Sequence, residues 1–286
     1  MTLDLIHDRL SFYDLPDRVA EENAIKEICQ EITLAALSRS DFFRVGAFMG
    51  GTCLRILHGL RRFSEDLDFV LRSPDPDFEW TPYLHAIEEE FKAFGLTCAA
   101  VDRSRAEQTV KKAFLKEDSF GQVLQLQYSR TRADLQKVVI KLEIDTHCPK
   151  GAQLNTVSLN YPYPFAVTSH DLPSLFAGKC NAILTRTYVK GRDWYDFLWY
   201  VRSKVNINLD LLKSSLEQFG HYAGLNITPS TKWLISELNT KITNLDWSKA
   251  RMDVDRFLSD NERRSLDLWG PDFFLSITEK LKNYLP

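Results

Sequence analysis

The sequence has few cysteines and no arrangement that gives them a structural task. Five Cys are scattered along 286 residues, odd in number and without a C-x-x-C pair, so neither a disulfide framework nor a zinc site is indicated. No run of about 18 apolar residues is present that could span a bilayer. Met1–Asp17 mixes charged and apolar residues, unlike a signal peptide. We therefore expect a cytoplasmic protein without a membrane partner.

The sequence also lacks a large net charge. Its 36 Lys and Arg against 39 Asp and Glu give −3 at pH 7, which does not indicate a nucleic-acid binder through the overall field. Local charge is less even, with nine basic and five acidic residues in 101–141, and four basic and no acidic ones in 179–192. Such segments suit a triphosphate or an RNA backbone. For 101–141, the solvated faces of strands explain the pattern equally well.

Length and composition favour two domains of a soluble protein. Apolar residues make up 44% and charged residues 26% of the chain, ordinary values for a globular protein. Tyr161-Pro162-Tyr163-Pro164 cannot continue a strand ladder, and we place the domain boundary there. The sequence predicts an α+β fold, with a mixed α/β domain at 1–160 and a helical domain at 161–286.

Apolar periodicity and turn residues predict the individual elements. In the first domain we expect helices at 16–38 and 79–94 and strands at 43–48, 97–101, 109–115, 122–128 and 137–146. In the second we expect a helix capped by Asp171, a helix that buries Trp194, and further helices near 208–219, 230–243 and 273–283.

The stretch Gly46–Leu71 carries the strongest chemical signal. It reads as a buried strand, a glycine turn, a short helix and a second strand. Asp66 and Asp68 are two residues apart on that second strand, so their carboxylates share one face. Neighbouring carboxylates repel unless water or a cation compensates them, and Mg²⁺ takes carboxylate oxygens while keeping positions open for phosphate. Asp66 and Asp68 are therefore our predicted metal ligands.

The glycine turn adds a predicted phosphate site. Gly50 and Gly51 allow backbone N–H groups to approach a phosphate, the following helix N-terminus favours negative charge, and Thr52 adds a hydroxyl. An isolated Gly-Gly is usually only a turn, and an isolated Asp-x-Asp is usually a solvated edge. Their joint occurrence, with Arg62 and Ser64 between them, favours a nucleotide site to which these five residues contribute.

Two further segments carry charge where it is informative. Apolar and charged residues alternate along 137–146, so Lys141, Glu143 and Asp145 share one face, which is either an exposed sheet surface or part of a site. In the second domain, Lys179 lies in the middle of an apolar helical stripe. Lysine is rarely buried without a partner, so we expect Lys179 to face a cleft between the domains and meet an anionic ligand or a carboxylate. Asp193 on the next helix could simply be a favourable N-terminal charge.

Two blocks of the sequence together resemble a known family. The first is Gly-Gly-Thr-x-Leu-Arg at 50–55 followed by Arg-Phe-Ser-Glu-Asp-Leu-Asp-Phe at 62–69. The second is Lys-x-x-Ala at 179–182, then Arg186, then Arg-Asp-x-Tyr-Asp at 192–196. Over about residues 44–200 the chain resembles the AbiEii/AbiGii toxins, the MenT-like nucleotidyltransferases of type IV toxin–antitoxin systems, within the polymerase-beta-like nucleotidyltransferase superfamily.

The resemblance implies a fold and an activity. The fold would be a nucleotidyltransferase domain with a mixed sheet flanked by helices, plus a helical domain that closes the nucleotide cleft. The activity would be transfer of an NMP from an NTP to an acceptor hydroxyl with release of pyrophosphate, using two Mg²⁺ ions at Asp66 and Asp68. The superfamily uses a third carboxylate on a neighbouring strand, for which Glu143 or Asp145 is the candidate, and we favour Glu143.

The same resemblance assigns the second block and the partners. Lys179 would bind the triphosphate, Asp193 would support catalysis with Asp196 as its neighbour, and Arg192 would contact the nucleotide. The acceptor would be RNA, most plausibly a tRNA 3′ end, and the protein would be a growth-inhibiting toxin restrained by a cognate antitoxin. No RNP or KH signature is present, so the choice of RNA rests on the resemblance alone.

Two other functions stay open at this stage. The same chemistry can serve a small hydroxylated molecule or a protein side chain as acceptor. Alternatively, the chain is a catalytically silent nucleotide-binding module. The intact glycine turn, the Asp66/Asp68 pair and Lys179 argue against silence, because a silent module has no physical need for paired metal carboxylates.

Overall fold

The structure is a computed structural model of the chain and describes residues 2–102, 119–129, 135–218 and 220–285. The expected strand 109–115 and much of the basic segment 101–141 lie outside the described residues. The chain forms two compact units. The first comprises Met1–Gly59, Phe63–Cys148 and Asn155–Ser169, and the second comprises Leu60–Arg62, Pro149–Leu154 and His170–Pro286.

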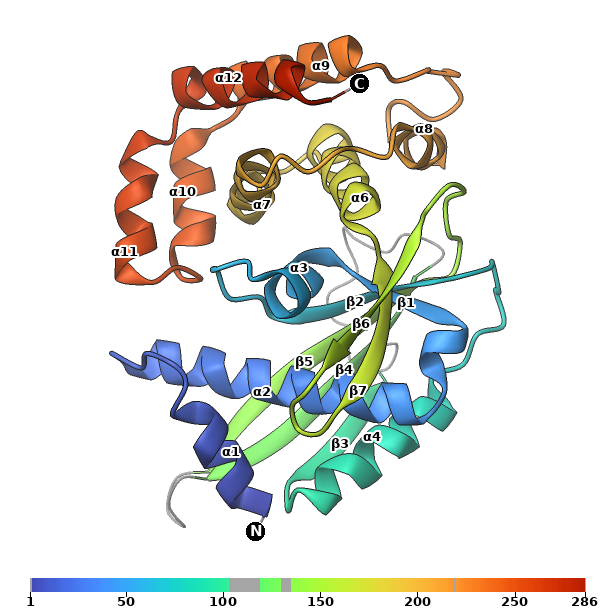
Figure 1. Cartoon of the computed structure of the whole chain (residues 1–286), viewed down its shortest axis with the longest axis vertical. Helices are drawn as coiled ribbons and strands as arrows, with labels where there is room; N and C mark the ends of the chain where they lie inside the picture. Colours follow the sequence, from blue (N-terminus) through green and yellow to red (C-terminus); the bar gives the residue numbers. More distant parts are fainter. Residues whose placement is uncertain (1, 103–118, 130–134, 219, 286) are drawn as a thin grey trace. The chain divides into compact units, whose positions relative to one another are not determined.

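A mixed sheet organises the first unit. Over the described residues it has seven strands, in the order β3-β4-β5-β2-β1-β7-β6 (Figure 1). The central strand β2 runs antiparallel to β1 and parallel to β5. The strands are β1 (Gly46–Met49), β2 (Asp66–Leu71), β3 (Thr97–Asp102), β4 (Ser119–Ser129), β5 (Leu135–Asp145), β6 (Leu154–Leu159) and β7 (Phe165–His170).

Helices cover the sheet of this unit. Helix α2 (Arg18–Arg39) packs against β5, α4 (Thr81–Ala93) packs against β3, and the two helices contact each other (Figure 1). The short helices α1 (Thr2–Leu10) and α3 (Gly50–His58) pack on α2 and on β2, respectively. Alternate apolar side chains of β2 and β5 are almost completely buried, as expected for half-buried strands: Leu67, Phe69, Ile140, Leu142 and Ile144.

The first strand is shorter than the sequence predicts. Residues Phe42–Arg44 form a 3₁₀ turn, η1, and the strand begins only at Gly46. Asp41 adopts a left-handed conformation with φ of 60°, which turns Phe42 into an aromatic cluster. The Phe42 ring stacks on Trp80 at 5.5 Å and meets the edge of Phe69 at 4.9 Å. Aromatic burial therefore outweighs the strand preference of this segment.

The other predicted elements of this unit are confirmed within a few residues. The expected helices 16–38 and 79–94 are α2 and α4, and the expected strands 97–101, 122–128 and 137–146 are β3, β4 and β5. Strands β6 and β7 escaped the sequence analysis. The Tyr161–Pro164 segment joins them rather than ending the sheet, and β7 pairs in parallel with β1 at Phe48 and Ser169.

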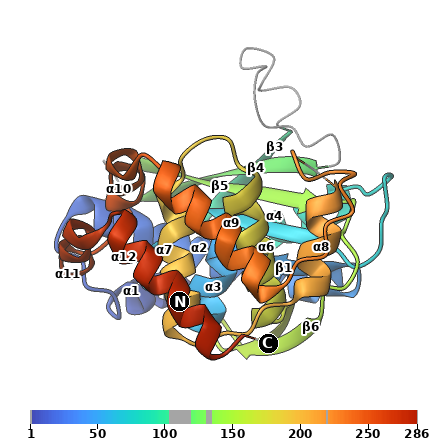
Figure 2. The same cartoon turned by 90° about the horizontal axis from the view of Figure 1, so that it is seen from above.

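The second unit is helical. Helix α6 packs on α7 and α8, while α9 and α12 lie side by side in both views (Figures 1 and 2). Its core contains a stacked pair, Trp247 and Phe274, with ring centroids 4.3 Å apart. The helices are α6 (Leu172–Thr185), α7 (Gly191–Arg202), α8 (Leu209–Gln218), α9 (Thr231–Asn244), α10 (Trp247–Asp255), α11 (Asp260–Arg263), η2 (Arg264–Leu268), α12 (Pro271–Glu279) and η3 (Lys280–Asn283).

The predicted helices of the second unit are confirmed where apolar residues recur at helical spacing. Asp171 caps α6 by accepting the Ser174 N–H at 2.9 Å, and the expected helices 208–219 and 230–243 are α8 and α9. The expected helix 273–283 corresponds to α12 and η3, whereas α10 and α11 were not predicted. Within the described residues no helix is long and apolar enough to cross a membrane. The predicted α+β fold class is confirmed.

Candidate active site

In the first unit, strand pairing places carboxylates side by side. Strands β2 and β5 run parallel with Asp68 opposite Glu143 and Asp66 opposite Lys141. Paired residues of neighbouring strands point to the same face, and so do residues two apart on one strand. Asp66, Asp68 and Glu143 therefore share one face of the sheet.

Asp145, the other candidate for the third carboxylate, lies one step further along. Its register partner is Val70, so it is two residues removed from the position beside Asp68. Its side chain is mostly buried and accepts the His147 backbone N–H at 3.0 Å. This geometry ties Asp145 to the turn after β5 and leaves Glu143 as the neighbour of Asp68.

Gly50 fits the turn that joins β1 to α3 for two reasons. Its φ of +82° is a conformation that side-chain-bearing residues rarely adopt. In addition, a Cβ at this position would collide with the Asp68 carboxylate. The N-terminus of α3 thus approaches Asp68 closely, and only glycine leaves room for both.

Thr52 and the Ser64 segment hold β2 in place. Thr52 is buried, and its hydroxyl donates to the backbone carbonyl of Asp66. The Gln30 amide donates to the backbone carbonyls of Ser64 and Glu65 at 3.1 and 3.0 Å. These bonds fix the entry to the strand that carries Asp66. The hydroxyl that we predicted to bind phosphate therefore has a backbone partner in this structure.

The donor chemistry of this face fits Mg²⁺, which prefers carboxylate oxygens. Asp66, Asp68 and Glu143 offer three carboxylates in neighbouring register positions. Across the described parts of the chain, however, no three His, Cys, Asp or Glu side chains are gathered closely enough to hold an ion. Their assignment as metal ligands accordingly belongs to the proposal below.

In the second unit, Lys179 of α6 lies between two carboxylates of α7. Its Nζ is 2.8 Å from Asp193 Oδ1 and 2.8 Å from Asp196 Oδ2, and its side chain is 12% exposed. The expected carboxylate partner is thus present, supplied by the Arg-Asp-x-Tyr-Asp segment. Asp193 and Asp196 are three residues apart on α7, so both can face Lys179 of the packed helix α6. This contact joins the two parts of the second sequence block.

Arg62 completes this buried cluster. Its Nε and Nη2 donate to the two carboxylate oxygens of Asp196 at 2.6 and 2.7 Å, the two-pronged geometry that guanidinium forms with carboxylates. The side chains of Arg62 and Asp196 are 3% and 0% exposed. In this structure the guanidinium that we predicted to bind nucleotide instead holds Asp196 in place.

For both carboxylates of the cluster, the neighbouring positive charges lower the pKa by more than burial raises it. Burial alone would raise the pKa of Asp193, but Lys179 and Arg186 lower it to about 2. The pKa of Asp196 is also lowered, because Arg62 and Lys179 outweigh its burial. The pKa of Lys179 is raised because the two aspartates outweigh its burial. All of these groups are therefore charged at neutral pH.

The remaining arginines of the second block have protein partners as well. Arg186 pairs with the second carboxylate oxygen of Asp193. Arg192 lies 3.7 Å from the carboxylate of Asp253 and over the Phe257 ring at 4.4 Å. Arg192, predicted to bind nucleotide, thus anchors α7 to the segment that contains α10.

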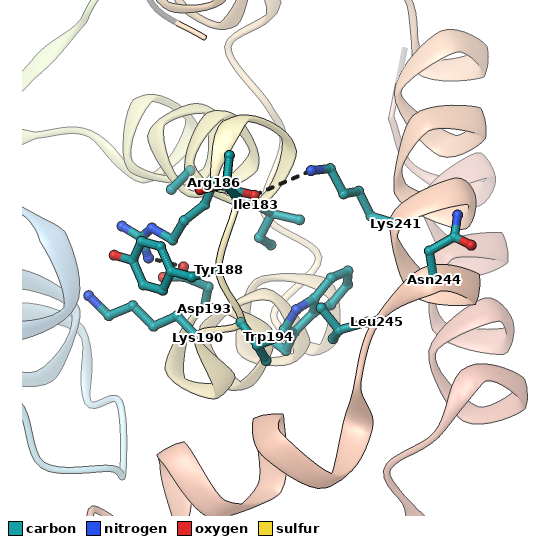
Figure 3. Close-up of a pocket in the computed structure, with 12 residues that line it drawn as sticks. Ile183, Arg186, Tyr188, Lys190, Asp193, Trp194, Lys241, Asn244 and Leu245 are labelled. Carbon is teal, nitrogen blue, oxygen red and sulfur yellow. Dashed lines mark hydrogen bonds and ion pairs between the residues drawn. The ribbon is translucent and has the colours of Figure 1, made fainter. Parts of the chain in front are cut away.

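A pocket of about 210 Å³ opens beside this cluster, within the second unit (Figure 3). Its walls come from the end of α6, the loop that follows, the start of α7, and α9. Its lining includes Lys190, one of the four basic residues of 179–192, and Lys241, which sequence reasoning missed. Nothing in a linear pattern relates Lys241 to the second block, because the two are about fifty positions apart and only the folding of α9 brings them together.

The fold has a counterpart among solved structures. The crystal structure of JHP933 from Helicobacter pylori matches with a TM-score of 0.50 and 18% identity, over 92% of this chain and 94% of that one. A second H. pylori structure, described as a candidate nucleotidyltransferase, matches with a TM-score of 0.48 and 17% identity, over 94% of this chain and 98% of that one. No curated protein sequence matches.

A family model decides the class. The sheet with paired carboxylates and the helical unit with its Lys-Asp cluster belong to a nucleotidyltransferase, because the model for the nucleotidyl transferase AbiEii toxin of type IV toxin–antitoxin systems matches residues 32–275. The chain is a member of the AbiEii family. The matched range includes both sequence blocks on which the resemblance was based.

Proposed function

We propose that this protein is a metal-dependent toxin that transfers an NMP from an NTP to the 3′ end of tRNA. The observation that carries the chemistry is the shared register of Asp66, Asp68 and Glu143 beside Gly50. Membership of the AbiEii family supports the NTP substrate and an antitoxin partner. The site of action would be the cytoplasm, where tRNA and NTPs are abundant.

In this proposal Asp66 and Asp68 hold Mg²⁺, and Glu143 completes the metal site. The bound metal would neutralise charge at the α-phosphate and on the leaving pyrophosphate. Glu143 lies beside Asp68 and would help to accept the proton of the attacking 3′-hydroxyl. A new phosphodiester bond forms to the acceptor oxygen while the bond between the α- and β-phosphates breaks.

The other residues would position the nucleotide. Backbone N–H groups of Gly50 and Gly51, at the N-terminus of α3, suit a phosphate oxygen. Lys179 keeps a small exposed fraction and supplies positive charge for the triphosphate, while Asp193 orients it. Catalysis would then come mainly from positioning and charge stabilisation.

Three predicted residues receive a positioning role instead. Arg62 holds Asp196 and thereby the Asp196 oxygen that faces Lys179. Thr52 fixes α3 to β2, and Arg192 holds α7 to Asp253. We propose that they support the site through these contacts.

The test incubates the purified protein, or its Asp66→Ala/Asp68→Ala variant, with total tRNA, Mg²⁺ and each labelled NTP in turn. We expect label on tRNA with the wild-type protein and none with the double variant. A folded wild-type protein that labels a small molecule or a protein instead of tRNA would remove tRNA as the acceptor. Nucleotide binding without transfer to any acceptor would favour the silent module.

A further inference from the structure

The pocket of the second unit is lined by positive charge from three elements. Arg186 follows α6, Lys190 precedes α7, and Lys241 lies on α9. Figure 3 shows Arg186, Tyr188 and Lys190 extending away from α9, while Lys241 extends from α9 towards the backbone carbonyl of Arg186. Two cations that are four residues apart and a third about fifty positions further along the chain thus line one pocket.

Lys190 is the pocket cation whose charge is least well compensated. Its backbone carbonyl accepts the Asp193 N–H at 3.1 Å, but within the described residues its ammonium group forms no hydrogen bond or ion pair. Burial lowers its pKa against the attraction of Asp193, and the like charges of Arg186 and Arg192 lower it further. A partly buried ammonium is unfavourable when burial and like charges outweigh the attraction of its one nearby carboxylate, so an anionic ligand would stabilise this arrangement.

Asp193, the carboxylate that lines the pocket, forms no ion pair with Lys190. Asp193 is the acidic residue among the described lining residues, and its two oxygens already face Lys179 and Arg186. Lys241 donates to the backbone carbonyl of Arg186 at 3.4 Å, a contact that brings no negative charge into the pocket. The carboxylate that attracts Lys241 is Glu237, which does not line the pocket. The lining therefore carries more positive than negative charge.

From this geometry we infer that Arg186, Lys190 and Lys241 form a subsite for a phosphate group. The volume of about 210 Å³ is below the roughly 300–1,000 Å³ of pockets that enclose a whole organic ligand, so one phosphate suits it better than a complete nucleotide. The subsite deepens the proposed function and rests on it for the source of the phosphate, which is either the triphosphate of the NTP or a phosphodiester of the RNA acceptor.

Direct binding tests this subsite without relying on activity. Calorimetric titrations in a phosphate-free buffer use inorganic tripolyphosphate in one arm and a short single-stranded RNA with a 5′-hydroxyl in the other. The variants are Lys190→Met and Lys241→Met. Lys232→Met is the matched control, because Lys232 is an exposed lysine of the same helix α9 that does not line the pocket.

We expect each pocket variant to weaken one probe by about tenfold, the usual consequence of losing a charged hydrogen-bond partner, while Lys232→Met stays within about twofold. Loss of tripolyphosphate binding assigns the subsite to the NTP, and loss of RNA binding assigns it to the acceptor. If both probes bind the pocket variants as well as they bind the control, the inference is overturned.

Thermal unfolding separates this role from a structural one. Without phosphate, Lys190→Met should melt at or above the wild-type temperature, because a partly buried and incompletely compensated charge has been removed. The stabilisation by tripolyphosphate or RNA should be lost. A variant that melts lower yet keeps its ligand-induced stabilisation would overturn the inference. Wild-type protein that binds phosphate through Lys190 but labels no RNA would retain the subsite and remove the proposed function.

Discussion

Asp68 of β2 and Glu143 of β5 lie opposite each other in a parallel strand pair. This relationship is the reason to prefer Glu143 over Asp145 as the third carboxylate, since Asp145 pairs with Val70 and is bound to the His147 N–H. The strand register therefore distinguishes Glu143 from Asp145, which share one face of the strand in the sequence, and it predicts different results for variants of the two residues.

Glu143→Gln should lower the rate of nucleotide transfer by about a hundredfold or more, because it removes a carboxylate beside Asp68 without changing side-chain size. Asp145→Asn should lower that rate by less than about tenfold and act mainly on stability, since its buried oxygen accepts a backbone N–H. Initial rates and thermal unfolding of both variants distinguish the two roles. The reverse order of rate losses would assign the third carboxylate to Asp145.

Gly50→Ala should damage both stability and transfer. The residue has φ of +82°, and its new Cβ would collide with the Asp68 carboxylate. Gly59→Ala is the matched control, because Gly59 has φ of +74° but no atom within 4 Å of an added Cβ. We expect both variants to lose roughly 1–2 kcal/mol to backbone strain, with transfer strongly reduced only in Gly50→Ala. If the two variants transfer nucleotide at equal rates, the Gly50 turn is not needed for the function of Asp68.

Arg62 of the first block and its neighbour Arg61 should behave differently. Arg62→Met leaves Asp196 buried and short of a partner, which should lower the free energy of unfolding by about 3–5 kcal/mol. Arg61 is 79% exposed in its pair with Glu262, and Arg61→Met should change that free energy by less than about 1 kcal/mol. Urea unfolding of both variants gives the comparison. A small loss in Arg62→Met would show that Asp196 does not depend on it.

The Asp193 ion pairs should make stability depend on acid pH. Lys179 and Arg186 lower the pKa of Asp193 to about 2 against the effect of its burial, whereas an unfolded aspartate has a pKa of about 3.9. Because the folded pKa is the lower one, the stabilisation is complete above about pH 4 and is lost as the pH falls towards 2.

The stability difference between wild type and Asp193→Asn should therefore be constant from pH 5 to 7 and shrink by about 2 kcal/mol below pH 4. Urea unfolding of both proteins across this pH range measures the difference. A difference for Asp193→Asn that does not change with pH would mean that the ion pairs do not stabilise the folded state.

The sequence predicted the site best where reactive residues lie at a spacing typical of a strand, a turn or a helix. Asp66 and Asp68 two apart on a strand, Gly50 before a helix, and Lys179 within an apolar stripe all indicate their surroundings by spacing alone. By contrast, the partner of Arg62 could not be predicted, since Asp196 lies 134 positions away and many carboxylates were available. Strand β6 is largely exposed, and its polar residues give little of the apolar alternation that identifies a strand. Lys241 joins Arg186 and Lys190 in the pocket only through the packing of α9.

The most direct measurement of the central claim compares two positions of the label in the NTP. With tRNA and Mg²⁺, label at the α-phosphate should appear on the tRNA, while label at the γ-phosphate should appear only in pyrophosphate, and both signals should vanish in Asp66→Ala/Asp68→Ala. Transfer of the γ-label to any acceptor would show phosphoryl rather than nucleotidyl transfer and contradict the account.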